Sequence, residues 1–305
     1  SAIGIGETIY FVFIWVFIFL AYGTTPLVSS LNTKNEINKL NYFINFGRNV
    51  SILLGLGSFL ILYVSSGNLI STFQPTPNIQ LLSSDYLVFR CIGLPFYLVN
   101  MHSTAVLRGL KYAKITFYSA LIVSISNIFF SLFFGLFLGF GAGGIGFASS
   151  LAFFCASIYS TIILKKQLNN IPSSKEEIDK PSLRKKFFSI GTYILIRSLF
   201  LTLFMAYLRN RASLMSMEEI ALQHILLQLW SVGYIFVDAI AIASQTLISE
   251  LVSKKEKYQN SRLQKELVSV TTAISFILAI ITVLFLDNFV EMFGDDKFDL
   301  YIDLQ

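Results

Sequence analysis

The sequence predicts an all-α membrane protein, a polytopic bundle of transmembrane helices. Hydrophobic residues make up 54% of the 305 residues, charged residues make up 13%, and the mean hydropathy is +0.67. Soluble domains contain fewer apolar and more charged side chains than this. The apolar residues also occur in long blocks, and one segment of the sequence is repeated. These three observations give the fold class and the organisation of the chain.

Eight blocks of apolar residues are each long enough to cross a bilayer as a helix, which takes about 20 residues. Backbone groups in hydrocarbon must satisfy one another, which restricts spanning segments to helices or closed barrels. The pattern does not contain the short alternating strands of a barrel. The expected spans are residues 7–30, 43–64, 84–108, 115–140, 143–166, 186–209, 216–249 and 265–289.

One segment of the sequence occurs twice. Residues 24–36, TTPLVSSLNTKNE, correspond without a gap to residues 244–256, SQTLISELVSKKE, at an offset of 220 residues. The first span then matches the seventh, and the second matches the eighth. Copies six helices apart run in the same direction, so their symmetry axis lies along the membrane normal, as in one large group of secondary transporters. We expect twelve helices in two parallel halves of six, of which eight spans are present here.

The repeat and a polar linker divide the chain into two lobes. Residues 1–168 are expected to form an N-lobe without its first helix, and residues 187–305 a C-lobe that stops after its third helix. Between them, residues 169–186 are polar and charged and contain two prolines. This composition is typical of a joint between two halves.

The placement of the charges follows the membrane topology. The net charge is +5, and Lys and Arg gather after the first, third, fifth and seventh spans. Residues 65–83 and 139–144, in the alternate loops, contain none, whereas loop 209–218 departs from the pattern with Arg209 and Arg211. Basic loops stay in the cytoplasm, so this asymmetry sets the orientation. It also explains the positive charge without a nucleic-acid partner.

The residues offer no pattern for metal, cofactor or enzyme chemistry. Cys91 and Cys155 fall inside spans, and His102 and His224 lie in different lobes, so neither pair assembles a metal site or a catalytic cluster. GFGAGG at 139–144 follows a membrane span rather than a strand, which excludes a dinucleotide-binding turn. We therefore expect no metal, no cofactor and no enzymatic activity, and each histidine to be packed or hydrogen-bonded.

Three stretches resemble the multidrug and toxic compound extrusion (MATE) transporters. Residues 90–130 resemble the part of that family in which a Gly-x-Pro helix leads to an Arg-Gly turn, a basic loop and an Asn-bearing fifth helix. GAGGIGFASSLAFF at 141–154 is similar to the start of the sixth helix. Residues 220–249 are similar to the eighth helix of the DinF-like branch. The resemblance covers helices two to nine of twelve.

The resemblance implies that the protein is a monomeric antiporter whose chain crosses the membrane several times. An inward H⁺ or Na⁺ gradient would drive export of organic cations, drugs or organic anions as two lobes rock about a central cavity. Asn127 matches the asparagine of the fifth helix, and Ser149 matches a hydroxyl position in the sixth. In proton-coupled members a carboxylate lies one turn after that asparagine, whereas this chain has Ser131 there. A second acid of the family lies in the missing first helix.

Two charged residues of the C-lobe are expected near the membrane midplane. Arg197 lies about 15 Å along its span from the cytoplasmic end, and Asp238 about 16 Å along the next, antiparallel span. Charges at this depth are costly and usually functional. Either Asp238 accepts a proton or cation and exchanges its partner during transport, or the two residues form a permanent structural ion pair.

Several polar residues complete the set of candidates. Gln223, Gln228 and Gln245 lie on the same expected helix as Asp238, where amides can coordinate substrate or form interhelical hydrogen bonds. Pro95 is a hinge candidate, with a static kink as the alternative. Arg48 and Arg90 are expected near span ends, with side chains that extend to the membrane surface.

A lipid-linked oligosaccharide flippase of related fold is the alternative function. It requires several arginines that face a central cavity to hold pyrophosphate, and Arg197 is the one predicted at midplane depth. A receptor or scaffold is a third possibility, against which the parallel repeat argues. The expected partners are the bilayer, a small organic substrate and H⁺ or Na⁺, and the membrane of residence is left open.

Overall fold

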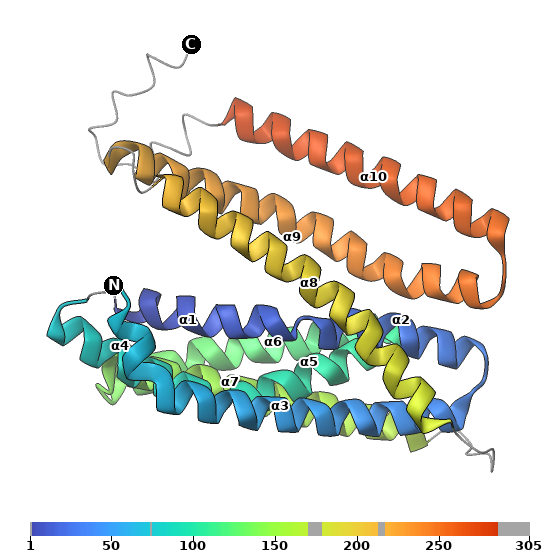
Figure 1. Cartoon of the computed structure of the whole chain (residues 1–305), viewed down its shortest axis with the longest axis horizontal. Helices are drawn as coiled ribbons and strands as arrows, with labels where there is room; N and C mark the ends of the chain where they lie inside the picture. The colour runs from blue at the N-terminus through green and yellow to red at the C-terminus, as the bar shows by residue number, and fades with distance from the viewer. Residues whose placement is uncertain (1, 74, 170–178, 213–216, 286–305) are drawn as a thin grey trace. The chain divides into compact units, whose positions relative to one another are not determined.

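The computed structural model describes residues 2–285 except 74, 170–178 and 213–216, and every regular element in these residues is helical (Figure 1). The all-α prediction is therefore confirmed. The elements in chain order are α1 (Ala2–Phe17), α2 (Phe19–Thr33), α3 (Ile37–Ser71), α4 (Pro77–Cys91), α5 (Leu94–Gly109), α6 (Ala113–Phe130), the π-helix η1 (Ser131–Phe137), α7 (Gly141–Asn169), α8 (Lys180–Ala212), α9 (Met217–Ser253) and α10 (Lys257–Leu284).

Six helical segments in the described residues are long and apolar enough to cross a membrane. They are Ala2–Thr33, Ile37–Ser71, Ala113–Phe137, Gly141–Leu168, Gly233–Ser253 and Lys257–Leu284. A seventh is α4 followed by α5, with a bend of 45° between them. The protein is an integral multi-pass membrane protein. The expected span 186–209 falls in α8, where several side chains lie outside the described residues, and it stays a prediction.

The helices group into two compact units, Ser1–Ser198 and Leu199–Gln305. The start of α8 belongs to the first unit, because Leu183 and Phe187 are buried in its core. Phe187 packs edge-on against Phe43 of α3, with 5.3 Å between the ring centroids. The lobes expected at 1–168 and 187–305 stay a prediction, since most of the linker lies outside the described residues.

The surface of the first unit is apolar where lipid would cover it. Leu53 and Val64 of α3 are 70% and 78% exposed, and Phe137 of η1 is 80% exposed. Large apolar side chains this exposed are unfavourable in water, and they are expected on helices that face hydrocarbon. In the second unit, α9 and α10 form an antiparallel hairpin, and no residue of α10 is buried (Figure 1).

The repeat in the sequence is also a repeat in local backbone geometry. α2 ends at Thr33 and α3 begins at Ile37, whereas α9 ends at Ser253 and α10 begins at Lys257, which preserves the offset of 220 residues. Asn35 and Lys255 both have a positive φ, of 55° and 61°.

Hydrogen bonds identify both turns as Schellman caps. The Glu36 amide donates to the Leu31 carbonyl oxygen at 3.0 Å, and the Glu256 amide donates to that of Leu251 at the same distance. Such a bond closes the last helical turn around one residue in the left-handed region. A third copy, with Lys111 at φ 68°, joins α5 to α6. The symmetry axis between the two halves stays a prediction.

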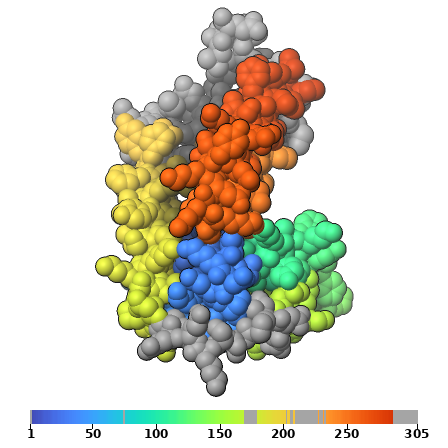
Figure 2. All heavy atoms as spheres, turned by 90° about the vertical axis from the view of Figure 1, so that its right-hand side faces the viewer, coloured from blue at the N-terminus to red at the C-terminus, as the bar shows by residue number. Residues whose placement is uncertain are grey.

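The basic turns of the first unit lie on one face. Figure 2 looks onto it and shows the α2–α3 turn in blue, the α5–α6 turn in green and the start of α8 in yellow. These segments carry Lys34, Lys39, Lys111, Lys114 and Lys180. Their gathering at one end supports the orientation expected from the charge pattern, with this face toward the cytoplasm.

Candidate functional site

The span from Pro77 to Gly109 is broken near its middle. α4 ends at Cys91 and α5 begins at Leu94, with Pro95 in its first turn. Proline has no backbone N–H to continue the ladder of α4, but it fits the first turn of a new helix. The kink expected at Pro95 is therefore present. Whether it acts as a hinge stays a prediction.

Arg90 immediately precedes this break, deep in the span. We expected its side chain to extend to the membrane surface, and this is wrong, because it is only 7% exposed. The helix begins at Pro77 rather than near residue 84. Its first turns carry polar residues such as Gln80 and Asp85, which hid the start of the helix from the hydropathy pattern.

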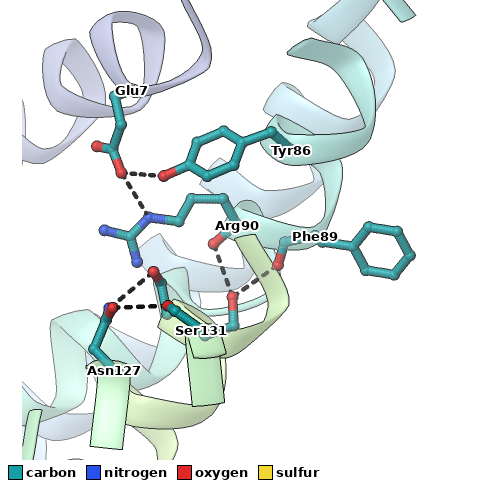
Figure 3. Close-up of polar contacts among 8 residues, drawn as sticks. Glu7, Tyr86, Phe89, Arg90, Asn127 and Ser131 are labelled. Atoms are coloured by element: carbon teal, nitrogen blue, oxygen red, sulfur yellow. Dashed lines mark hydrogen bonds and ion pairs between the residues drawn. The ribbon is translucent and has the colours of Figure 1, made fainter. Parts of the chain in front are cut away.

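Arg90 forms an ion pair with an acid on another helix. Its Nε lies 3.3 Å from Oε1 of Glu7 on α1. The hydroxyl of Tyr86, one turn before Arg90 on α4, donates a hydrogen bond to the same Glu7 oxygen (Figure 3). The carboxylate thus joins α1 to α4 through two polar side chains.

Two aromatic rings flank the guanidinium of Arg90. Its Cζ lies 4.2 Å from the ring centroid of Tyr10 on α1 and 5.5 Å from that of Phe153 on α7. Rings placed in this way stabilise a cation through their quadrupoles. They also exclude water from the ion pair, which strengthens its attraction and increases the cost of separating its charges.

The hydrogen-bonding capacity of this cluster is incompletely used. Oε2 of Glu7, the hydroxyl of Tyr10 and Nε and Nη1 of Arg90 are buried without a hydrogen-bond partner among the described residues. The 3.3 Å approach of Nε to Glu7 is an ion pair that lacks the alignment of a hydrogen bond. Buried polar groups are nearly always satisfied, and exceptions are concentrated where groups bind or exchange something. The cluster can therefore accept a proton, a cation or an anion.

A second polar group contains two of the residues predicted from the sequence. Nδ2 of Asn127 on α6 donates to Oγ of Ser149 on α7 at 2.9 Å. The hydroxyl of Ser131 donates to Oδ1 of Asn127 at 3.2 Å. Ser131 is also the first residue of η1, where the helix widens into π-geometry, a feature that is frequent at functional sites.

α7 links the two polar groups. Ser150, next to Ser149, donates to the carbonyl oxygens of Phe89 and Arg90 at 2.7 and 3.0 Å. Phe153 lies one helical turn after Ser149, on the same face. Figure 3 shows the guanidinium of Arg90 between Glu7 on one side and the Asn127–Ser131 pair on the other. We define these residues as the N-unit polar cluster: Glu7, Tyr10, Tyr86, Arg90, Asn127, Ser131, Ser149 and Phe153.

Glycine permits the close packing around this cluster. A Cβ on Gly146 of α7 would lie 3.2 Å from the amide nitrogen of Arg90 and would collide with the carbonyl oxygen of Tyr86. A Cβ on Gly6 of α1 would lie 2.6 Å from Cδ1 of Tyr86. The missing side chains bring α1 and α7 close enough to α4 for the contacts to form.

The candidates in the C-lobe are only partly described. Arg197 is exposed on α8, in the first unit, and Asp238 is half-buried on α9, in the second. Their expected ion pair stays a prediction. Gln245 is half-buried on α9, whereas the side chains of Gln223 and Gln228 lie outside the described residues.

The sequence analysis did not identify Glu7, Tyr86 or Arg90 as site residues. Glu7 is the one acid in the first 33 residues and lies within a long apolar segment. This isolated charge could have identified it as a site residue. Its partner could not be deduced, because Arg90 lies 83 residues later and the start of α4 was hidden. Pairing across helices depends on the tertiary packing that the glycines permit.

Sequence comparisons link the chain to known transporters. Residues 1–133 match the family described as MatE. The chain is 23% identical over 209 residues to Protein DETOXIFICATION 43 of Arabidopsis thaliana, a match that covers 68% of this chain and 39% of that protein. It is 28% identical over 159 residues to the lipid II flippase MurJ of Thermosipho africanus, covering 49% and 33%. The chain thus spans well under half the length of these relatives.

Solved structures show the same fold. An outward-facing multidrug resistance MATE family transporter of the MOP superfamily aligns with a TM-score of 0.88 at 15% identity, over 98% of this chain and 67% of that one. A MOP superfamily transporter from Pyrococcus furiosus, described as having a binding pocket of reverse polarity, aligns with a TM-score of 0.86 at 15% identity, over 97% and 66%. At these identities the likeness concerns the fold alone.

The helical spans and the buried charges define an integral multi-pass membrane protein. Residues 1–133 resemble the MatE family, and the chain shares its fold with solved MATE transporters. Its place in the DinF-like branch stays a prediction.

Proposed function

We propose that the protein is a secondary active transporter, an antiporter that uses an H⁺ or Na⁺ gradient to export small organic solutes by alternating access. The observation that carries this proposal is the buried ion pair of Glu7 and Arg90 beside the break between α4 and α5. The match of residues 1–133 to the MatE family and the fold shared with MATE transporters support the transport class. The coupling ion, the substrate and the role of each residue are part of the proposal.

The ion pair offers a route from ion binding to helix movement. A proton or Na⁺ on Glu7 removes or screens the negative charge that holds Arg90. The guanidinium then remains charged between Tyr10 and Phe153 with fewer partners, which is costly in a low-dielectric site. Because Glu7 joins α1 to α4, loss of this attraction favours a different arrangement of the two helices at the break.

Asn127, Ser131 and Ser149 are proposed to take part beside this pair. Their hydroxyl and amide groups can donate to an anion or coordinate a cation without a charge of their own. In this proposal Glu7 supplies the carboxylate that the family pattern places one turn after the asparagine, where this chain has Ser131. Asp238, Arg197 and the glutamines Gln223, Gln228 and Gln245 are proposed as the corresponding polar set of the other half.

Flux measurements on the full-length protein in proteoliposomes test the proposal. Ethidium is used as a cationic probe and succinate as an anionic one, with imposed pH or Na⁺ gradients. We expect one gradient to drive uphill movement of a probe, and Glu7→Gln to abolish this coupling. Asp85→Asn is the matched control, because Asp85 is an exposed acid on α4 without a described ion pair.

Two outcomes of that experiment contradict the proposal. Probe movement that is indifferent to both gradients removes the antiporter function. Gradient-driven movement that persists in Glu7→Gln removes the assignment of the coupling site, while leaving antiport in place.

Lipid-linked oligosaccharide translocation is the second candidate. It is favoured by the match to the lipid II flippase MurJ and by Arg90, a second arginine at membrane depth beside the predicted Arg197. Arginine binds pyrophosphate through paired hydrogen bonds. Transbilayer movement of a fluorescent polyprenyl-pyrophosphate sugar in the same liposomes, lost in Arg90→Gln and independent of ion gradients, would favour this candidate over antiport.

A further inference from the structure

A cavity of about 430 Å³ lies within the first unit, separate from the N-unit polar cluster. It is lined by residues of α3, α5 and α7. Its volume lies in the range of pockets that hold small ligands. Seven of the ten residues that line it are polar, and the lining consists of Asn41, Ile44, Asn45, Arg48, His102, Ser103, Thr161, Leu164, Lys165 and Leu168.

Two cations from different helices line this cavity without an acid. Arg48 comes from α3 and Lys165 from α7, and none of the lining residues is Asp or Glu. Among the described residues, neither cation forms an ion pair with a carboxylate. Two unpaired cations that face one pocket repel each other, and an anion between them removes that cost. The amides of Asn41 and Asn45 and the hydroxyl of Thr161 add neutral hydrogen-bond donors.

His102 contributes to the wall of the cavity rather than to its charge. The carbonyl oxygen of Ile44 only accepts, so Nε2 of His102, 3.1 Å away, donates to it. Nδ1 lies 3.4 Å from the Thr24 hydroxyl. A side chain on Gly47 would collide with the imidazole ring, so glycine makes room for it. The expectation that His102 is packed or hydrogen-bonded is confirmed, and both ring nitrogens already have partners.

The cavity lies toward the basic end of the unit. Lys165 is in the last two turns of α7, which ends at Asn169, and Asn41 is in the first two turns of α3. These helix ends belong with the basic turns on the face in Figure 2. If that face is cytoplasmic, as the charge pattern predicts, the cavity lies at the depth of lipid headgroups of the inner leaflet. Basic pockets between helices at this depth bind phosphate-bearing headgroups.

We propose that this cavity binds a phosphate group, held between Arg48 and Lys165 and further hydrogen-bonded by Asn41, Asn45 and Thr161. The phosphate belongs either to the headgroup of an anionic phospholipid or to a soluble phosphate ester. Arg48 presents a planar pair of donors and Lys165 a point charge, a combination suited to phosphate oxygens. The site does not depend on the transport function proposed above.

Lipid binding to the full-length protein in nanodiscs tests the site. The nanodiscs contain phosphatidylcholine alone or mixed with phosphatidylglycerol, and a further arm adds glycerol 1-phosphate to phosphatidylcholine nanodiscs. Thermal unfolding and native mass spectrometry measure binding. The variants are Arg48→Gln with Lys165→Gln, and Lys166→Gln as a matched control that removes a neighbouring charge outside the lining of the cavity.

We expect a bound phosphate compound on the wild type and on Lys166→Gln, and about tenfold weaker binding to the double variant. Arg48→Lys with Lys165→Arg keeps both charges and should restore part of the affinity. Binding of phosphatidylglycerol but not glycerol 1-phosphate identifies a lipid headgroup, and the reverse identifies a soluble ester. Binding of neither overturns the proposal. An equal loss in Lys166→Gln also overturns it, because the attraction would then be diffuse.

Discussion

The two copies of the repeat agree in backbone geometry and differ in the charges they bury. Asn35 and Lys255 occupy equivalent left-handed positions, and the helices on either side end and begin at equivalent residues. The buried acid does not recur: the position equivalent to Glu7 is Leu227, and the position equivalent to Asp238 is Ile18. The matched stretches 7–29 and 227–249 thus contain one acid each, at different places.

This difference separates what the fold requires from what function requires. A Schellman cap satisfies the last carbonyl groups of a helix, and every copy of a helical hairpin needs such a termination. A buried carboxylate destabilises a span unless it is paired, so nothing in the fold requires it to be duplicated. We interpret the shared turn as structural and Glu7, whose equivalent position is Leu227, as a residue that function rather than the fold requires.

Removing Glu7 should have the largest effect on stability. Glu7→Ala leaves Arg90 buried without its carboxylate, and we expect a loss of about 3 kcal/mol in the free energy of unfolding. Glu7→Leu combined with Arg90→Leu removes both charges and should recover most of this loss. Unfolding by denaturant in detergent micelles measures all three proteins. A double variant as unstable as Glu7→Ala would show that the pair itself, rather than the uncompensated arginine, accounts for the effect.

Disturbing the close packing of α7 against α4 should have the second largest effect on stability. Gly146→Ala inserts a Cβ against the backbone at Tyr86 and Arg90, and we expect a cost of about 2 kcal/mol. Gly57→Ala on α3 is the matched control, since a Cβ there meets nothing within 4 Å. It should stabilise its helix by up to about 1 kcal/mol. The same denaturation assay distinguishes them, and equal effects would refute the packing argument.

Loss of the Ser149 hydroxyl should have a smaller effect. Ser149→Ala leaves Nδ2 of Asn127 without its 2.9 Å acceptor, which costs about 1 kcal/mol. Ser157→Ala is the control on the same helix, because its hydroxyl bonds only locally, to the Phe154 carbonyl oxygen. If Ser149→Ala changes neither stability nor flux, the Asn127 group is not part of the site.

Substitutions at the left-handed residue of each shared turn should have the smallest effects on stability. Lys255→Gly relieves the strain of a side chain in the left-handed region and should stabilise by about 1 kcal/mol. Asn35→Gly should stabilise the protein by less, since asparagine tolerates the left-handed region. Thermal unfolding measures both. Destabilisation by either glycine would contradict the equivalence of the two turns.

The sequence predicted those features that are determined locally. Apolar runs predicted most of the helices, and the repeated segment predicted that residues 24–36 correspond to residues 244–256, where the structure has equivalent turns. The resemblance indicated Asn127 and Ser149, which the structure places in contact. The partnership of Glu7 with Arg90 was not predictable, because polar residues concealed the start of α4 and because the contact depends on two glycine-mediated helix approaches.

Infrared difference spectroscopy of the full-length protein between acidic and neutral pH tests most directly whether the Glu7 carboxylate takes up a proton. Because other acids of the chain also gain a carbonyl band when they are protonated, the difference spectrum of Glu7→Gln is subtracted from that of the wild type. We expect this subtraction to leave the carbonyl stretch of one protonated carboxylic acid, and the same subtraction with Asp85→Asn in place of the wild type to leave it as well. A subtraction that leaves no carboxylic-acid band would contradict the account, because the proton would then be bound by a different acid.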